Sequence, residues 1–383
     1  MEMCKLFILL LIIGLVVMGC NPASTKKSIK IGHPGDFSGP YSFYDSPVRN
    51  GARFAIDEIN AAGGVLGMPL ELVAKDCRND QGLGVRLTEE LIRDGAVYII
   101  GTTGDPILAQ GSVSCAAGVP ISTGDGTAPT LVGDMGKCAF QICMSDNIQG
   151  ALVAEYAYKQ GYRTAYMVYS TETPYTNNLP IYFQKAFEKL GGKVSGYELY
   201  RIESGDYSAQ VTKLVNLSTK PDFIFTPMFL PDTPVFMHQL RAAGLTYPVI
   251  STDGNHDESL IKAGKAVEGL IFTTHGYPTN GNKADKLWQS YKAKTGNYPA
   301  NIAFAVGYDE IYYLKKAIES VGSTEPEKII EGLSKISNFD GVLGTYTMDP
   351  KTHRVQKPVT IIGIKDGAFV FVDQFYPGYV PDI

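Results

Sequence analysis

The feature that most constrains the fold is a long alternation of strand-length apolar runs with amphipathic segments. The amphipathic segments repeat apolar residues every three or four positions, as helices with one buried face do. The predicted strands cover 28–33, 70–76, 97–101, 119–123, 139–143, 164–170, 193–200, 222–228 and 248–252. The predicted helices cover 47–62, 82–94, 107–117, 147–160, 175–190, 207–217 and 233–243. Strands and helices in this order form a parallel, doubly wound α/β sheet.

The number of these units exceeds what one sheet usually holds, and the chain of 383 residues is long for a single domain. We therefore expect two similar α/β lobes. The last part of the chain differs, with helices predicted at 283–295 and 301–321 and strands at 344–349, 359–367 and 368–373. Asp366-Gly367 between the last two strands predicts a hairpin turn.

The N-terminus has the pattern of a secretory signal. Leu6–Val17 is a continuous apolar run after Lys5, and it is shorter than the ~20 residues that a membrane-spanning helix needs. The following "VMGC" (17–20) resembles the processing box of bacterial lipoproteins, in which Cys20 would be lipidated. The alternative is ordinary signal cleavage nearby, with Cys20 an incidental thiol. We predict a lipoprotein signal peptide at 1–20 and a polar, flexible tether at 21–28.

Charge and motifs exclude several function classes. The net charge is −5, and no block of like charge indicates a nucleic-acid partner. No phosphate-binding loop, zinc-protease motif or nucleophile elbow is present in the sequence, so catalysis is unsupported and no cofactor is predicted. The five histidines are dispersed, and no C-x2-C pair indicates a metal site. The four cysteines after Cys20 allow three full disulfide pairings, and the sequence does not choose among Cys77, Cys115, Cys138 and Cys143.

Three acidic phrases follow predicted strands: "TGDP" (103–106), "TGDG" (123–126) and "STDG" (251–254). Ligands of open α/β sheets bind in the crevice beyond the carboxyl ends of the strands, which is where these phrases lie. A phosphate cradle would present amides and a Lys, and an Asp there would repel the anion. Asp105, Asp125 and Asp253 are therefore candidates for binding something other than phosphate.

Several longer stretches carry a family resemblance: "IKIGHPGDFSGPYSFYDSPVRNGARFAIDEINAAGGVLGMPLELVAKDCRND" (29–80), "GVPISTGDGTAPTL" (118–131), "FMHQLRAAGL" (236–245) and "GYDEIYYLKKAI" (307–318). From Ile29 to about Asp373 the chain resembles the branched-chain amino acid-binding family of periplasmic binding proteins, the solute receptors of ABC importers. The resemblance implies two lobes that close on a ligand, outside the cytoplasmic membrane. It also implies an ABC permease and ATPase as partners.

The resemblance also implies three crossovers between the lobes, near 142–146, 274–277 and 343–346. The first lobe would consist of 29–143 plus 276–343. The second lobe would consist of 144–275 plus 344–383.

Site residues are carried over from the resemblance position by position. Asp253 matches an acid that binds the ligand ammonium, while Asp105 stands where a Ser binds the ligand carboxylate. Asp125 and Thr127 match the loop that offers a carbonyl and a hydroxyl. Aromatic positions match Tyr44, Tyr175 and Phe229, and the cysteine pair of some family members is replaced by Asn79 and Gly104.

The acidic replacements change the expected ligand. A ligand carboxylate facing Asp105 in a closed cleft is unfavourable, so we predict that the three acids hold a cationic group of an amino acid, polyamine or quaternary amine. The aromatic residues would add cation–π attraction. The alternatives are that Asp105 or Asp125 only caps a helix or turns a loop, that the acids bind Ca²⁺, or that the protein is a sensor rather than a transport receptor.

Overall fold

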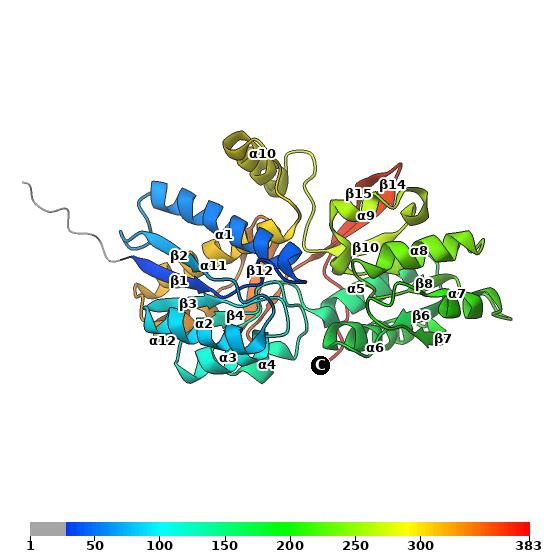
Figure 1. Ribbon diagram of the computed structural model, residues 1–383, viewed down its shortest axis with the longest axis horizontal. Coiled ribbons are helices and arrows are strands. Elements are labelled where there is room, and N and C mark those ends of the chain that lie inside the picture. Colours follow the sequence, from blue (N-terminus) through cyan, green and yellow to red (C-terminus); the bar gives the residue numbers. More distant parts are fainter. Residues whose placement is uncertain (1–27) are drawn as a thin grey trace, which may run out of the picture.

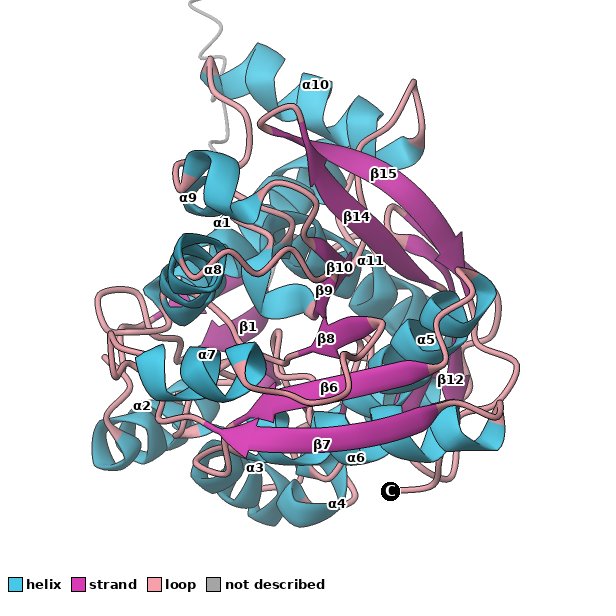
Figure 2. Cartoon of the chain, turned by 90° about the vertical axis from the view of Figure 1, so that its right-hand side faces the viewer, coloured by secondary structure: helices cyan, strands magenta, loops and turns pink. Residues whose placement is uncertain are grey.

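The computed structural model describes residues 28–383, which form two α/β lobes side by side (Figure 1). The first lobe contains a five-stranded sheet in the order β2-β1-β3-β4-β5, with every neighbouring pair parallel. The second contains a seven-stranded sheet in the order β15-β14-β10-β9-β8-β6-β7 (Figure 2). The predicted fold class, two doubly wound lobes, is confirmed. The signal peptide and Cys20 lie outside the described residues.

The first lobe is built on a hydrophobic core between its sheet and two long helices, α1 and α11. These helices cross at glycines: a Cβ on Gly51 would lie 1.8 Å from the Phe304 carbonyl oxygen, and one on Gly307 would lie 2.0 Å from that of Val48. The elements of this lobe are β1 (Ile29–His33), α1 (Ser42–Ala61), β2 (Leu70–Ala74), α2 (Gln81–Arg93), β3 (Ala96–Ile100), α3 (Ile107–Ala116), β4 (Ile121–Ser122), α4 (Leu131–Met135), β5 (Ala139–Phe140), α10 (Lys283–Thr295), α11 (Ala303–Val321) and α12 (Pro326–Ser334).

The second lobe has its parallel strands extended by an antiparallel pair. The chain reverses between β14 and β15 at Asp366 and Gly367, both with positive φ, so the predicted hairpin is confirmed. The elements are α5 (Asp146–Lys159), β6 (Thr164–Tyr169), α6 (Pro174–Lys189), β7 (Lys193–Leu199), α7 (Ser208–Val215), β8 (Phe223–Phe225), α8 (Asp232–Ala242), β9 (Val249–Ser251), α9 (Glu258–Ile261), β10 (Ile271–Thr274), β14 (Val359–Lys365) and β15 (Ala368–Phe375).

A small third sheet lies at one predicted boundary. It consists of β11 (Phe339–Gly341), β12 (Gly344–Asp349) and β13 (Arg354–Gln356). Tyr346 and Val355 belong to the core of the first lobe, and Gln141, next to β5, bridges to Arg354. Residues 344–356, which we expected in the second lobe, thus share the hydrophobic core of the first lobe through Tyr346, Met348 and Val355. The chain passes to the second lobe at 357–358.

Helix α1 begins earlier than predicted, at Ser42 instead of Pro47, and this places Tyr44 and Asp45 on a helix. Pro47 lacks the N–H that would bond to the Phe43 carbonyl oxygen. The side-chain amide of Asn301 donates to that oxygen at 2.8 Å instead. The proline is tolerated because a residue far along the chain replaces the missing donor.

The cysteines form a single disulfide among the described residues, between Cys115 and Cys138. Cys77 and Cys143 are buried free thiols, so none of the two-bridge pairings that the sequence allowed is formed. Within residues 28–383, no helix combines the length and the apolar character that crossing a membrane requires.

Candidate functional site between the lobes

A cavity of about 240 Å³ lies between the lobes at the carboxyl ends of the parallel strands. The first lobe contributes the start of α1 and the loops after β3 and β4, and the second contributes the loops after β6, β8 and β9. All seven residues predicted from the sequence line this one cavity: Tyr44, Asp105, Asp125, Thr127, Tyr175, Phe229 and Asp253. The remaining wall is largely apolar, with Tyr41, Ile107, Leu108 and Leu131.

The carboxylate of Asp253 is positioned by the hydroxyl of Tyr175, a residue of the same lobe. The Tyr175 hydroxyl donates to Asp253 Oδ1 at 2.8 Å and lies 2.7 Å from Thr252 Oγ1. Thr173 caps the N-terminus of α6 by accepting the Thr176 N–H, and this cap positions Tyr175 in the first turn. Burial, followed by the charge of Asp253, raises the pKa of Tyr175 well above its usual value, so the hydroxyl stays a donor. Tyr175 also meets Phe229 edge to face, with ring centroids 6.1 Å apart.

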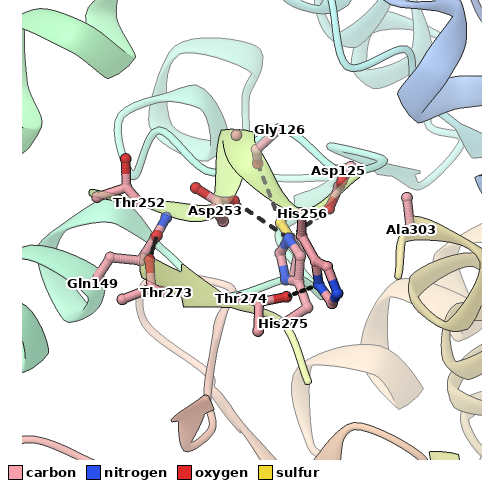
Figure 3. A network of polar contacts seen from close by, with 12 residues as sticks. Asp125, Gly126, Gln149, Thr252, Asp253, His256, Thr273, Thr274, His275 and Ala303 are labelled. Carbon is pink, nitrogen blue, oxygen red and sulfur yellow. Dashed lines mark hydrogen bonds and ion pairs between the residues drawn. The ribbon is translucent and has the colours of Figure 1, made fainter. Parts of the chain in front are cut away.

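Asp125 and Asp253, which line the cavity and form its floor, share one cation behind them, His275 (Figure 3). His275 itself lines a smaller adjoining cavity. His275 Nε2 lies 2.8 Å from Asp125 Oδ1 and 3.4 Å from Asp253 Oδ2, with the imidazole almost fully buried. The ring nitrogen is not aligned for a hydrogen bond to either oxygen, so the contact is an electrostatic one. We call Asp125, His275 and Asp253 the inner triad.

The charge of the inner triad follows from two opposing effects on the imidazole. Burial lowers the pKa of His275, but the carboxylates of Asp125 and Asp253 outweigh it and raise that pKa to about 9. His275 is therefore an imidazolium at neutral pH. Two carboxylates and one imidazolium leave the inner triad with a net charge of −1.

His275 is the residue of the candidate site that sequence analysis missed, because the strand before it, β10, was not predicted. Ile271–Thr274 is short and half made of threonine. It is followed by His-Gly, just as two of the other strands are followed by a segment with Asp-Gly. β10 pairs in parallel with β9, so both strands deliver their following residues to the same edge of the sheet. The recurring pattern of an apolar run, a charged residue and a glycine could have identified His275.

Asp105 lies at the rim and is exposed. Its carboxylate accepts from the Asn79 amide at 3.2 Å, and its own N–H donates to Asn79 Oδ1 at 2.9 Å. Helix α3 begins at Ile107 without a side-chain cap, so Asp105 is not a helix cap. The loop that carries it is anchored by Asp45 of α1, which accepts from the Thr103 N–H at 2.9 Å and from the Thr102 hydroxyl at 2.5 Å.

The loop after β4 is joined to the crossover between the lobes. The Thr127 carbonyl oxygen accepts from the N–H of Asp146, the first residue of α5, at 3.0 Å. Asp125 in this loop contacts His275 and caps neither α4 nor α5. A further hydroxyl was not predicted: Thr103 Oγ1 is buried beside the cavity and has no hydrogen-bond partner among the described residues.

Metal ligation has no geometric support in the part of the chain that the structure describes. Within residues 28–383, no three His, Cys, Asp or Glu side chains are grouped so that they could hold a metal ion. In the inner triad, the position that a cation would take between Asp125 and Asp253 is occupied by the imidazole.

The two lobes, the cavity between them and its charged floor define a binding protein of the two-lobe type. A family model described as a periplasmic binding protein matches residues 28–368. The leucine-, isoleucine-, valine-, threonine- and alanine-binding protein of Pseudomonas aeruginosa is 27% identical over 326 residues, which cover 85% of this chain and 86% of that protein. The chain belongs to the branched-chain amino acid-binding family of type I periplasmic binding proteins.

Solved structures agree with this assignment. The leucine-binding protein LivK of Thermotoga maritima has a TM-score of 0.80 and 30% identity, with 91% of this chain and 99% of that chain covered. LivJ of Streptococcus pneumoniae, solved in complex with isoleucine, has a TM-score of 0.81 and 23% identity, with 92% and 100% covered, and shows the shared fold.

Proposed function

We propose that the protein is an extracytoplasmic solute-binding lipoprotein of an ABC importer that captures an amino acid or an amino-acid-like amine by closure of the cleft. The family supports solute binding rather than catalysis, and its members that bind leucine or isoleucine support an amine-bearing ligand. An ABC permease and ATPase would receive the ligand. Lipidation of Cys20 would tether the protein to the outer face of the cytoplasmic membrane.

The observation that carries the ligand class is the net charge of the inner triad. A buried site with an uncompensated negative charge is stabilised when a cation enters it and forms hydrogen bonds. Asp253 is the main acceptor in this proposal, because Asp125 lies closer to His275. The ammonium of the ligand would contact Asp253, and the carbon skeleton of the ligand would pack against Tyr44, Tyr175 and Phe229.

The other predicted residues have lesser roles in this proposal. Thr127 and Thr103 offer hydroxyls to a polar group of the ligand. Asp105 lies at the exposed rim, where solvent screens its charge, so it would attract a cation without binding it strongly.

The test is a thermal-shift screen of the mature protein with amino acids, mono- and diamines, quaternary amines and Ca²⁺. A ligand that binds the folded state raises the apparent melting temperature by mass action. We expect amino acids or amines to raise it. A response to Ca²⁺ alone, or to organic acids that lack nitrogen, would contradict the proposal.

A further inference from the structure

His275 occupies a position that reaches both lobes. It directly follows β10 of the second lobe and begins the segment that returns to the first lobe. Asp125 comes from the first lobe and Asp253 from the second, so a single imidazole joins an acid of each lobe. Its main chain is also held, because the Lys357 ammonium in the third crossover donates to the His275 carbonyl oxygen at 3.2 Å.

The groups around His275 leave it as the cation that faces both carboxylates. His256 lies nearby with Nδ1 2.6 Å from Thr274 Oγ1, and burial followed by the charge of His275 lowers its pKa to about 3, so it is neutral. Asp146 is fully buried, and burial followed by the charge of Asp253 raises its pKa well above the usual value. Lys357 contacts the backbone of His275 rather than its ring.

The charge of His275 limits the number of ligand ammonium groups that Asp125 and Asp253 can accept. With the imidazolium present, one ligand ammonium brings the inner triad to neutrality, and a second would leave a buried excess of positive charge. We propose that His275 is a specificity-determining residue that restricts the inner site to one cationic nitrogen and excludes a second. This inference rests on the proposed amine-binding function and adds the charge class of the ligand.

The test compares two variants and two probes of similar size. His275→Gln removes the charge and keeps a polar side chain, while His256→Gln is the matched control because it replaces a neighbouring histidine that carries no charge. The probes are propylamine and 1,3-diaminopropane, whose second ammonium can take the place of the imidazolium. Titration calorimetry at pH 7 gives the ratio of the two dissociation constants for each protein.

We expect His275→Gln to shift this ratio at least tenfold toward the diamine and His256→Gln to leave it within about twofold of the unmodified protein. A folded His275→Gln variant with an unchanged ratio, or one that binds neither amine, would overturn the inference.

A ligand-free measurement separates this inference from the proposed function. Nuclear magnetic resonance of histidine side chains in the unmodified protein reports the protonation of His275 directly, even where the variant does not fold. An imidazolium at pH 7 supports the inference, and a neutral ring overturns it. If the unmodified protein binds neither amine and no amino acid or amine of the thermal-shift screen, the proposed function fails, while this titration still decides whether His275 carries the charge.

Discussion

The same three letters, Thr-Gly-Asp, produce two different electrostatic environments in the two loops of the first lobe. Asp125 is buried and paired with an imidazolium across the cleft. Asp105 is exposed and hydrogen-bonded to the neutral amide of Asn79. The difference shows that burial and partner determine how strongly a carboxylate binds a cation, because solvent screens exposed charge pairs far more than buried ones. Substitutions in the inner triad should therefore have larger effects than substitutions at the rim.

The largest effect on binding is expected for Asp253→Asn. This change keeps the size of the side chain but removes the proposed partner of the ligand ammonium, and truncating a buried charge pair costs about 2–5 kcal/mol. We expect affinity for an amine ligand to fall by roughly a hundredfold in calorimetry.

Asp257→Asn is the control for this experiment. Asp257 lies four residues further along the chain and caps α9 by accepting the Ser259 N–H, a role that asparagine can also fill. If the two variants lost affinity equally, the special role of Asp253 would be refuted.

The next effect concerns stability and pH. The pKa of His275 rises from 6.5 to about 9 on folding, so its stabilising contribution is complete below pH 6.5 and is lost as pH rises through 9. At about 1.4 kcal/mol per pKa unit, the contribution is about 3 kcal/mol. Between pH 6.5 and 9.5, the melting temperature of the unmodified protein should therefore fall further than that of the His275→Gln variant. Parallel pH curves for the two proteins would argue against the imidazolium.

A smaller effect is expected for Tyr175→Phe, which removes the donor to Asp253 Oδ1 and leaves the aromatic ring in place. A hydrogen bond to a charged group contributes about 1.5–3 kcal/mol, and the ligand ammonium can compensate for part of it. We expect a loss in affinity of about 1 kcal/mol. Phe229→Leu tests the aromatic wall of the cavity, because it removes the ring that meets Tyr175 edge to face and changes no side-chain hydrogen bond. An unchanged affinity for Tyr175→Phe would mean that Asp253 does not need this hydroxyl.

The smallest effect is expected for Asp105→Asn. Exposed charges contribute about 0–1 kcal/mol, so we expect little change in affinity and a weaker salt dependence of the association rate. Stopped-flow measurements at low and high salt would show this. A loss as large as that for Asp253→Asn would place Asp105 in the binding site proper and remove the distinction between rim and floor.

Much of the fold could be predicted because its elements are locally specified. The ranges of α10 and β12 were predicted to the residue, and strands such as β6 and β14 are apolar runs that periodicity identifies. The crossover between 356 and 359 could not be predicted. The sequence pattern of β12 would be the same in either lobe. Its side chains pack in the first lobe because they contact distant residues of that core, such as Tyr313.

The sequence predicted residues that line the cavity, but it did not predict the positive charge of His275 beside them. The family resemblance and the strand ends brought Asp105, Asp125 and Asp253 together, and all three line one cavity. The predicted cluster of three acids was incomplete, because His275 enters it from the end of β10, a strand that is specified by its place between β9 and β14 rather than by its own sequence. Whether these residues bind the ligand stays a prediction.

The central claim is that the cleft recognises a positively charged nitrogen, and three matched compounds test it most directly. Leucine carries an ammonium and a carboxylate, 3-methylbutylamine carries the ammonium alone, and 4-methylpentanoate carries the carboxylate alone. Calorimetry at pH 7 on the mature protein should show binding of the amine, of leucine or of both, and none of 4-methylpentanoate. Binding of 4-methylpentanoate without binding of the amine would contradict the account.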